Sequence, residues 1–383
     1  MIPFVPLDYE TLRLIWWLLL GVLLIGFAVM DGFDLGVGTL LPFVARNDDE
    51  RRIVINTIGP VWEGNQVWLI LGGGAIFAAW PMLYAVSFFG FYLAMMVILV
   101  AIILRPVGFK YRSKIADTRW RATWDGALFV GGFVPALIFG VAVGNVLLGV
   151  PFRFDDALRP IYEGGFFGLL SPFALLAGLL SVAMLVAHGA SMLMLKTGGA
   201  IYERARTYGS FAALAAIALF ALAGIWVVLG FNGYVVTSVQ DTGGPSNPIG
   251  KTVVRESGAW IANYGRHPWM IIAPLLGFLG SAIALFSYMR RIAGLAFIGT
   301  ATAIVGIIST AGLSLFPFLL PSSLDPNVSL TVWDASSSHL TLWIMLIAAL
   351  VFLPIIIAYT AFVYWVMRGK VTTEGLSKNP NAY

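Results

Sequence analysis

The chain has 383 residues, of which 59% are hydrophobic and only 11% are charged, and its formal net charge is +4 at pH 7. Soluble proteins carry about 25% charged residues, so this composition excludes a soluble globular protein and predicts a helical membrane protein. The chain contains no cysteine, which excludes disulfides, iron–sulfur clusters and thiolate metal sites. The basic excess needs no nucleic-acid partner, because Lys and Arg accumulate in the cytoplasmic loops of membrane proteins.

Long apolar blocks predict an all-α polytopic membrane protein with about nine transmembrane helices, since about 20 apolar residues cross the hydrocarbon core of a bilayer. In chain order, the predicted spans are residues 14–36, 65–82, 84–104, 124–149, 164–195, 210–230, 269–288, 295–318 and 340–366. We expect a single integral membrane domain over residues 1–383. The segments 231–268 and 319–339 are rich in Gly, Pro, Ser and Asn, which predicts irregular or short helical loops.

The basic residues orient these spans. Most of the 23 Lys and Arg residues fall on one side of the membrane if the N-terminus lies outside. These inner residues are Arg46, Arg51, Arg52, Arg105, Lys110, Arg112, Lys114, Arg119, Arg121, Lys196, Arg204, Arg206, Arg290, Arg291, Arg368, Lys370 and Lys378. The positive-inside rule therefore predicts an outer N-terminus, a cytoplasmic C-terminus, and outer loops at 231–268 and 319–339. Every Lys and Arg is then assigned to a loop or to the end of a span.

Four carboxylates remain near the cytoplasmic half of the membrane. Asp31 and Asp34 are three residues apart in the first span, so both point to the same face of a helix. Glu63 begins the second span and Asp125 begins the fourth, where each could be a hydrated residue favoured by the helix dipole. We favour that interpretation for Asp125 and leave it open for Glu63.

Asp31 and Asp34 are harder to explain as surface residues. An ionisable group inside a span costs about 2.5–3.5 kcal/mol on insertion scales and usually faces an interior or a water path. Two carboxylates on one face therefore indicate a proton or cation route, or a buried polar interface with a partner. Asn65 and Gln66 add hydrogen-bonding groups close to Glu63.

Aromatic residues and histidines give weaker signals. Trp62 and Trp68 are typical of the interfacial aromatic belt. His188 lies near the inner end of the fifth span and could ligate a haem, but no second histidine lies at a matching depth. We therefore favour a packed or interfacial imidazole for His188.

Several long motifs indicate a family. They are "DYETLRLIWWLLLGVLLIGFAVMDGFDLGVG", "RNDDERRIVIN", "WEGNQVWLI", "RPVGFKYRSKI", "GNVLLGVPF", "FPFLLPSS" and "SLTVWDASSSHLTLWIM". With their spacing from Asp8 almost to the C-terminus, these motifs resemble subunit II of the cytochrome bd-type quinol oxidases. The resemblance covers the whole chain.

The resemblance implies a complex that oxidises quinol and reduces dioxygen to water in the bacterial cytoplasmic (inner) membrane. Two haems b and one haem d would belong to a haem-bearing subunit I, and this chain would ligate none of them. The implied fold has two four-helix bundles plus a peripheral helix. The implied role is assembly, haem retention and proton delivery, so that a proton-motive force arises without pumping. Small single-span accessory subunits and a structurally bound quinone are further expectations.

Position by position, Asp34 and Glu63 match the family's acids assigned to a cytoplasmic proton entry. Many relatives have Asp where this chain has Glu63. With Asn65 and Gln66, Glu63 would form a hydrated funnel, from which Asp31 and Asp34 would relay protons, and Asp125 is a further candidate for the path. Trp62 matches a tryptophan that lines a structural quinone pocket in some relatives.

Two other functions stay open from the residues alone. A secondary transporter would hold its substrate near the midplane at broken helices, where this chain offers only hydroxyl residues such as Thr300 and Ser309. A scaffold would stabilise a haem-bearing partner without moving protons. Purification distinguishes a transporter from an oxidase subunit, whereas mutants of the acids distinguish a scaffold from a proton conductor.

Overall fold

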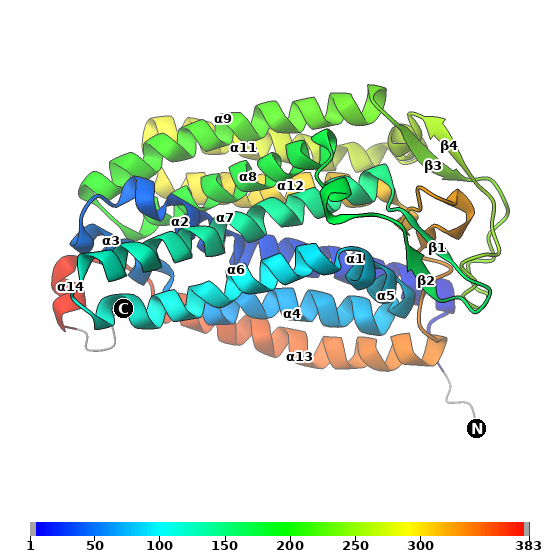
Figure 1. Cartoon of the computed structure of the whole chain (residues 1–383), viewed down its shortest axis with the longest axis horizontal. Coiled ribbons are helices and arrows are strands. Elements are labelled where there is room, and N and C mark those ends of the chain that lie inside the picture. The colour runs from blue at the N-terminus through cyan, green and yellow to red at the C-terminus, as the bar shows by residue number, and fades with distance from the viewer. Residues whose placement is uncertain (1–4, 379–382) are drawn as a thin grey trace.

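The computed structural model describes residues 5–378 and 383, and nearly all of its long elements are helices that run along one axis (Figure 1). In chain order the α-helices are α1 (Tyr9–Met30), α2 (Gly32–Val44), α3 (Asp48–Ile58), α4 (Trp62–Ala79), α5 (Pro81–Gly90), α6 (Tyr92–Tyr111), α7 (Thr118–Leu148), α8 (Pro172–Lys196), α9 (Gly199–Leu229), α10 (Ala262–Arg266), α11 (Ile272–Arg290), α12 (Ala293–Leu315), α13 (His339–Val366) and α14 (Thr373–Lys378). The strands are β1 (Phe152–Phe154), β2 (Pro160–Tyr162), β3 (Asn232–Val236), β4 (Val253–Ser257), β5 (Phe318–Leu320) and β6 (Leu330–Thr331).

The helices confirm the predicted all-α polytopic class. Within the described residues, 8 helical stretches are long and apolar enough to cross a membrane. The 18-residue helix α4 lies alongside them but is less apolar, because Glu63, Asn65 and Gln66 fall in its first turns. Counting α4 gives the expected number of about nine crossings.

Two spans are interrupted helices. The first continues from α1 through Asp31 into α2 and ends at Val44, whereas the third consists of α5 and α6 joined at Phe91. The sixth span begins earlier than its apolar block, at Gly199, because the polar segment before residue 210 is also helical. Helical hydrogen bonding thus extends beyond the apolar residues that mark a span.

The crossings pack as two groups and one outlying helix. Helices α8, α9, α11 and α12 contact one another, and the second group consists of α1/α2, α4, α6 and α7, which joins the first because both α2 and α7 pack against α8. Small residues bring α11 and α12 together: a Cβ on Gly306 would lie 2.1 Å from the backbone nitrogen of Gly277, which is the close approach that small residues permit between membrane helices. Helix α13 lies against α1 and α4 at the edge of the molecule, and its fully buried residues are Leu342 and Leu346 (Figure 1).

The two ends of the bundle differ. One end carries α3 and α14, and the other carries the hairpins β1–β2 and β3–β4 (Figure 1). The loops at this second end are therefore partly strands, not only irregular or short helical as expected. Arg13 ties α1 to both long loops, since its guanidinium donates to Ser336 Oγ at 2.8 Å and to the carbonyl oxygens of Thr242 at 2.6 Å and Gly244 at 3.0 Å.

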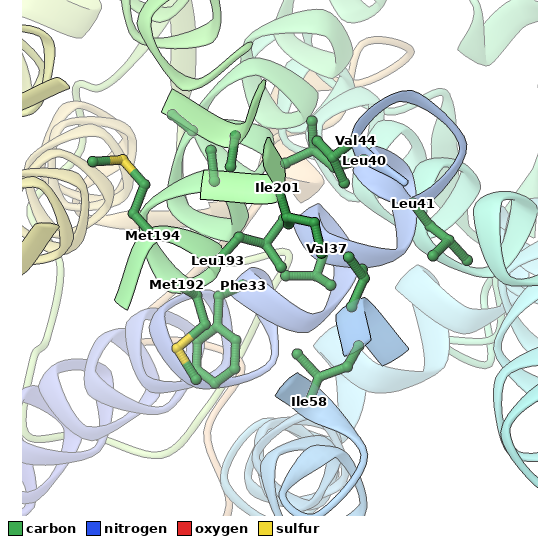
Figure 2. Packing of buried hydrophobic residues seen from close by; sticks show 14 of the residues in the cluster. Phe33, Val37, Leu40, Leu41, Val44, Ile58, Met192, Leu193, Met194 and Ile201 are labelled. Carbon is green, nitrogen blue, oxygen red and sulfur yellow. The ribbon is translucent and has the colours of Figure 1, made fainter. Parts of the chain in front are cut away.

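The α2 helix lies in the middle of the largest hydrophobic cluster. Figure 2 shows its side chains, including Phe33, Val37 and Leu41, among residues of α8 such as Met192 and Leu193. These five residues are at most 3% exposed. Helix α2 is thus surrounded by protein, and any polar side chain that it carries must find its partners inside the chain.

Candidate functional site

Asp31 and Asp34 lie where the first span changes helix. Asp31 is the single residue between α1 and α2, and Asp34 lies in the first turn of α2. Each residue is only 1% exposed. The two carboxylates do share one face, because Arg105 Nη2 lies 2.8 Å from Asp31 Oδ1 and 3.9 Å from Asp34 Oδ2.

Arg105 is the cation of this cluster, and it was not expected inside a span. It lies in α6, is 2% exposed, and donates to both carboxylate oxygens of Asp31, at 3.0 Å from Nη1 and 2.8 Å from Nη2. The assignment of every Lys and Arg to a loop or span end is therefore wrong for Arg105. Two buried carboxylates need a countercharge, and Arg105 can supply it in the bidentate geometry that guanidinium and carboxylate groups favour.

Asp34 has a second set of partners. Asn65 of α4 donates from Nδ2 to Asp34 Oδ2 at 2.8 Å, and Tyr364 of α13 donates from its hydroxyl to Asn65 Oδ1 at 2.7 Å. The tyrosine hydrogen bond orients the amide so that its nitrogen faces Asp34. Among the described residues, Asp34 Oδ1 has no hydrogen-bond partner.

The cluster contains more acidic groups than basic ones. Two carboxylates face one guanidinium, so the group is neutral when it holds one proton and carries an excess negative charge when it holds none. Burying an unpaired charge is costly. Asp31 is paired with Arg105 through both oxygens, whereas Asp34 Oδ1 has no partner among the described residues, so Asp34 is the less compensated of the two acids.

Comparison with known proteins identifies the family. The sequence matches the family described as cytochrome bd terminal oxidase subunit II over residues 12–367. The chain belongs to this family. As a subunit II of this type, it is part of an oxidoreductase complex, and the resemblance seen in its motifs is confirmed.

Curated relatives cover nearly the whole chain. The chain is 52% identical over 376 residues to the cytochrome bd-I ubiquinol oxidase subunit 2 of Escherichia coli strain K12, a match of 98% of this chain and 99% of that protein. It is 51% identical over 377 residues to the probable cytochrome oxidase subunit 2 of Haemophilus influenzae, with the same coverage of 98% and 99%. The bd oxidase structure from Geobacillus thermodenitrificans shares the fold, with a TM-score of 0.67 at 18% identity over 93% of this chain and 99% of that chain.

In this subunit II, Glu63 does not face the acidic cluster. Residues two apart on a helix point in nearly opposite directions, and Asn65 already faces Asp34. Glu63 is accordingly exposed on the outside of α4, and Gln66 is half-buried. The structure brings Asp31, Asp34 and Asn65 together, but it does not place Glu63 among them.

Asp125 belongs to a different cluster. Helix α7 begins at Thr118, so Asp125 is not at the helix start but two turns inside, where it is 4% exposed. It accepts hydrogen bonds from Arg112 at 2.5 Å and from Arg51 at 2.7 Å. The interpretation of Asp125 as a hydrated residue at the start of a helix is therefore wrong. Asp125 of α7 thus binds Arg51 of α3 and Arg112, the residue that follows α6, and so connects these three helices at one end of the bundle.

Trp62 is buried, and its ring is the first of three neighbouring aromatic rings. Its ring stacks on Phe109 at a centroid distance of 5.1 Å, and Tyr383 lies 5.6 Å beyond Phe109. Trp62 Nε1 has no hydrogen-bond partner among the described residues. This nitrogen is itself buried and the ring is packed like a core residue, so the quinone pocket expected at Trp62 stays a prediction.

The three histidines lie in different surroundings. His188 is fully buried, and its ring nitrogens lie 2.8 Å from Thr300 Oγ1 and 2.9 Å from the carbonyl oxygen of Val29. His339 Nε2 lies 2.7 Å from the carbonyl oxygen of Leu7, and His267 is in an exposed loop. Within the residues described, no group of three or more His, Asp or Glu is arranged to hold a metal ion. His188 is thus the packed imidazole favoured from the sequence.

Proposed function

We propose that this chain supports a haem-bearing subunit I and delivers protons to it from the cytoplasm, within a quinol:dioxygen oxidoreductase of the bacterial inner membrane. The quinol is inferred to be ubiquinol because the Escherichia coli relative is a ubiquinol oxidase subunit. Two haems b and one haem d would lie in the partner, where they supply the redox chemistry when bound. Small single-span subunits are further expected partners.

One observation carries the proton role: Asp34 is buried, and one of its carboxylate oxygens is unpaired beside a complete ion pair. Arg105 and Asp31 neutralise each other, so the proton of the cluster is left to Asp34. Asn65 and Tyr364 hold the other oxygen, Oδ2, in place. The free oxygen Oδ1 then has a fixed direction, as a group that exchanges protons requires.

Proton delivery of this kind would contribute to the proton-motive force across the membrane. Reduction of dioxygen consumes protons, which a hydrocarbon environment cannot supply. If these protons come from the cytoplasm and quinol protons are released outside, each turnover separates charge across the membrane. The chain would then conduct protons without forming or breaking any bond of the quinol or of dioxygen. Glu63 stays the proposed entrance, with Gln66 one turn further along α4, on the resemblance to the family alone, because its side chain points away from the acidic cluster.

A purely structural role is the second candidate, and the bidentate Asp31–Arg105 pair favours it. Such a pair can fix α1 and α2 against α6 without any proton transfer. A scaffold does not require the third group, Asp34, whose free oxygen adds only a desolvation cost. We therefore give the proton role to Asp34 and the structural role to Asp31 and Arg105.

The test is Asp34→Asn in the purified complex. The amide keeps the shape and can still bond Asn65, but it cannot release a proton. We expect oxygen uptake to fall by about tenfold or more, as for loss of a proton-transferring group, with the haem spectra unchanged. Asp34→Glu, which keeps the acid, is the matched control. Unchanged uptake in Asp34→Asn would remove the proton role, and loss of the haems would favour the scaffold.

A further inference from the structure

His188 is a buried polar residue that the proposed proton path does not use. It lies in α8, and its Nε2 is 2.9 Å from the carbonyl oxygen of Val29. A carbonyl oxygen only accepts, so Nε2 carries the hydrogen. Val29 lies in the last turn of α1, where carbonyl groups lose their partners within the helix.

The same imidazole touches the other side of the junction. The ring of Phe33, in the first turn of α2, meets the His188 ring edge-on at a centroid distance of 5.9 Å. His188 therefore contacts one residue before Asp31 and one residue after it. Phe33 is also the chain neighbour of Asp34.

Two further contacts hold the imidazole in place. Its Nδ1 lies 2.8 Å from the hydroxyl oxygen of Thr300 in α12, and the ring of Phe297 lies 4.6 Å away on the same helix. Next to His188, the backbones of α8 and α2 touch: a Cβ on Gly189 would lie 2.5 Å from the carbonyl carbon of Gly36. The α2 helix cannot shift along α8 without breaking this contact.

We infer that His188 is a positioning residue, which fixes the junction between α1 and α2 and thereby aims Asp31 and Asp34 at Arg105 and Asn65. It joins the last turn of α1, the first turn of α2 and the α12 helix through one rigid ring. Loss of the Val29 hydrogen bond frees the junction to rotate, and the Asp34 carboxylate turns with it. The effect on turnover rests on the proposed proton role of Asp34.

An ordinary core histidine would satisfy its two nitrogens within neighbouring helices and leave the acids unaffected. The feature that distinguishes His188 is its pair of contacts on both sides of the single residue, Asp31, that separates α1 from α2. A shift of about 1 Å in a reacting group can cost about a hundredfold in rate. The junction is therefore a place where one hydrogen bond can control function.

The experiment compares two variants of the assembled complex. His188→Gln retains an N–H donor for Val29 and an acceptor for Thr300, whereas His188→Leu keeps the bulk and loses both. Turnover is measured as oxygen uptake against pH, and the distances from Asp34 to Asn65 and from Asp31 to Arg105 are measured by electron cryomicroscopy. We expect His188→Leu to lower turnover by about tenfold or more and to lengthen both distances, and His188→Gln to stay within about twofold.

A double variant separates positioning from general damage. If His188 acts through Asp34, adding His188→Leu to Asp34→Asn costs no further turnover, because the two changes remove the same step. Additive losses, equal losses in the Gln and Leu variants, or unchanged turnover in His188→Leu would each overturn the inference.

Two further outcomes are decided by the same measurements. If His188→Leu does not assemble, His188→Phe replaces it, since a phenyl ring keeps the planar shape but loses both hydrogen bonds, and unchanged distances in that variant overturn the inference. If Asp34→Asn itself leaves turnover unchanged, the proposed proton role fails, and the inference is judged on the two distances alone. Lengthened distances in His188→Leu with intact distances in His188→Gln support it, and unaltered distances in both reject it.

Discussion

Arg105 of α6 and Asp31 of the first span form a two-point ion pair, with side chains 3% and 1% exposed. The residues are 74 positions apart in the chain, so the pair forms only when α6 packs beside the junction of α1 and α2. It neutralises one of two neighbouring acids and leaves Asp34 as the group with a spare oxygen. The roles that we propose for the two acids, a structural one for Asp31 and proton exchange for Asp34, follow from this pairing.

Arg105→Leu should therefore be severely destabilising. Removing one partner of a buried ion pair costs about 3–5 kcal/mol because the other charge is left uncompensated. We expect little assembled complex, measured as haem-containing complex recovered from membranes. The double variant Arg105→Leu with Asp31→Asn removes both charges and should recover assembly in part. Full assembly of the single variant would contradict a structural role for the pair.

Gly36→Ala tests the contact between α2 and α8. A Cβ at this position would lie 2.0 Å from the carbonyl oxygen of Leu185, whereas a Cβ on Gly73 has nothing within 4 Å. We expect Gly36→Ala to lower the temperature of thermal inactivation by several degrees or to prevent assembly, since overpacking costs about 1–3 kcal/mol. Gly73→Ala is the control and should leave that temperature unchanged or raise it slightly. Equal behaviour of the two variants would argue against the packing described.

The charges of the Lys251–Asp334 pair, in the two long loops, should be removable together. Lys251 Nζ lies 2.8 Å from Asp334 Oδ2, with side chains 3% and 8% exposed. Burial raises the pKa of Asp334 and lowers the pKa of Lys251, so holding both groups charged has a desolvation cost. Asp334→Asn should destabilise by about 3 kcal/mol because it leaves Lys251 uncompensated. Lys251→Met with Asp334→Asn should recover most of that loss, because both charges are gone and the amide oxygen can still accept a hydrogen bond from Thr331. Thermal inactivation of the three complexes gives the comparison, and a double variant worse than the single one would contradict it.

Glu50 should give the complex an acid-dependent contribution to stability. Two hydrogen bonds from Arg204, at 2.7 and 3.1 Å, lower the pKa of Glu50 below its usual range. A depressed carboxyl pKa stabilises the folded state above the usual value of about 4.3, and this stabilisation is lost as the pH falls through the lowered pKa. Glu50→Gln should therefore cost about 1 kcal/mol near neutral pH and progressively less in acid.

The half-buried pair of Glu203 and Arg206, whose carboxylate is more exposed than that of Glu50, is the control for this pH dependence. Their atoms lie 3.1 Å apart, but the Glu203 side chain is 43% exposed. Surface ion pairs contribute little because water screens them. Thermal inactivation of Glu203→Gln should match the unchanged complex from about pH 4 to pH 8. If Glu50→Gln behaves like this control, the Arg204 contact has no role in stability.

The amino-acid sequence by itself determined the membrane class, the approximate spans and the burial of Asp31 and Asp34. These properties follow from local composition: a block of apolar residues must be helical in lipid, and an acid inside it must be shielded. The motifs also determined the family. Nothing in the local pattern separated the inward Asn65 from the outward Glu63, because both sit in the same short polar segment.

Only the tertiary structure decided the partners. The sequence alone places Arg105 in a basic loop and Asp125 at the start of a span. It shows Tyr364 only as one aromatic residue of an apolar block. Their roles depend on which face of α6, α13 and α7 turns toward which neighbour. Helix periodicity gives the angle between residues of one helix, but the rotation of each helix against the others comes from packing of small residues and buried charges over the whole bundle.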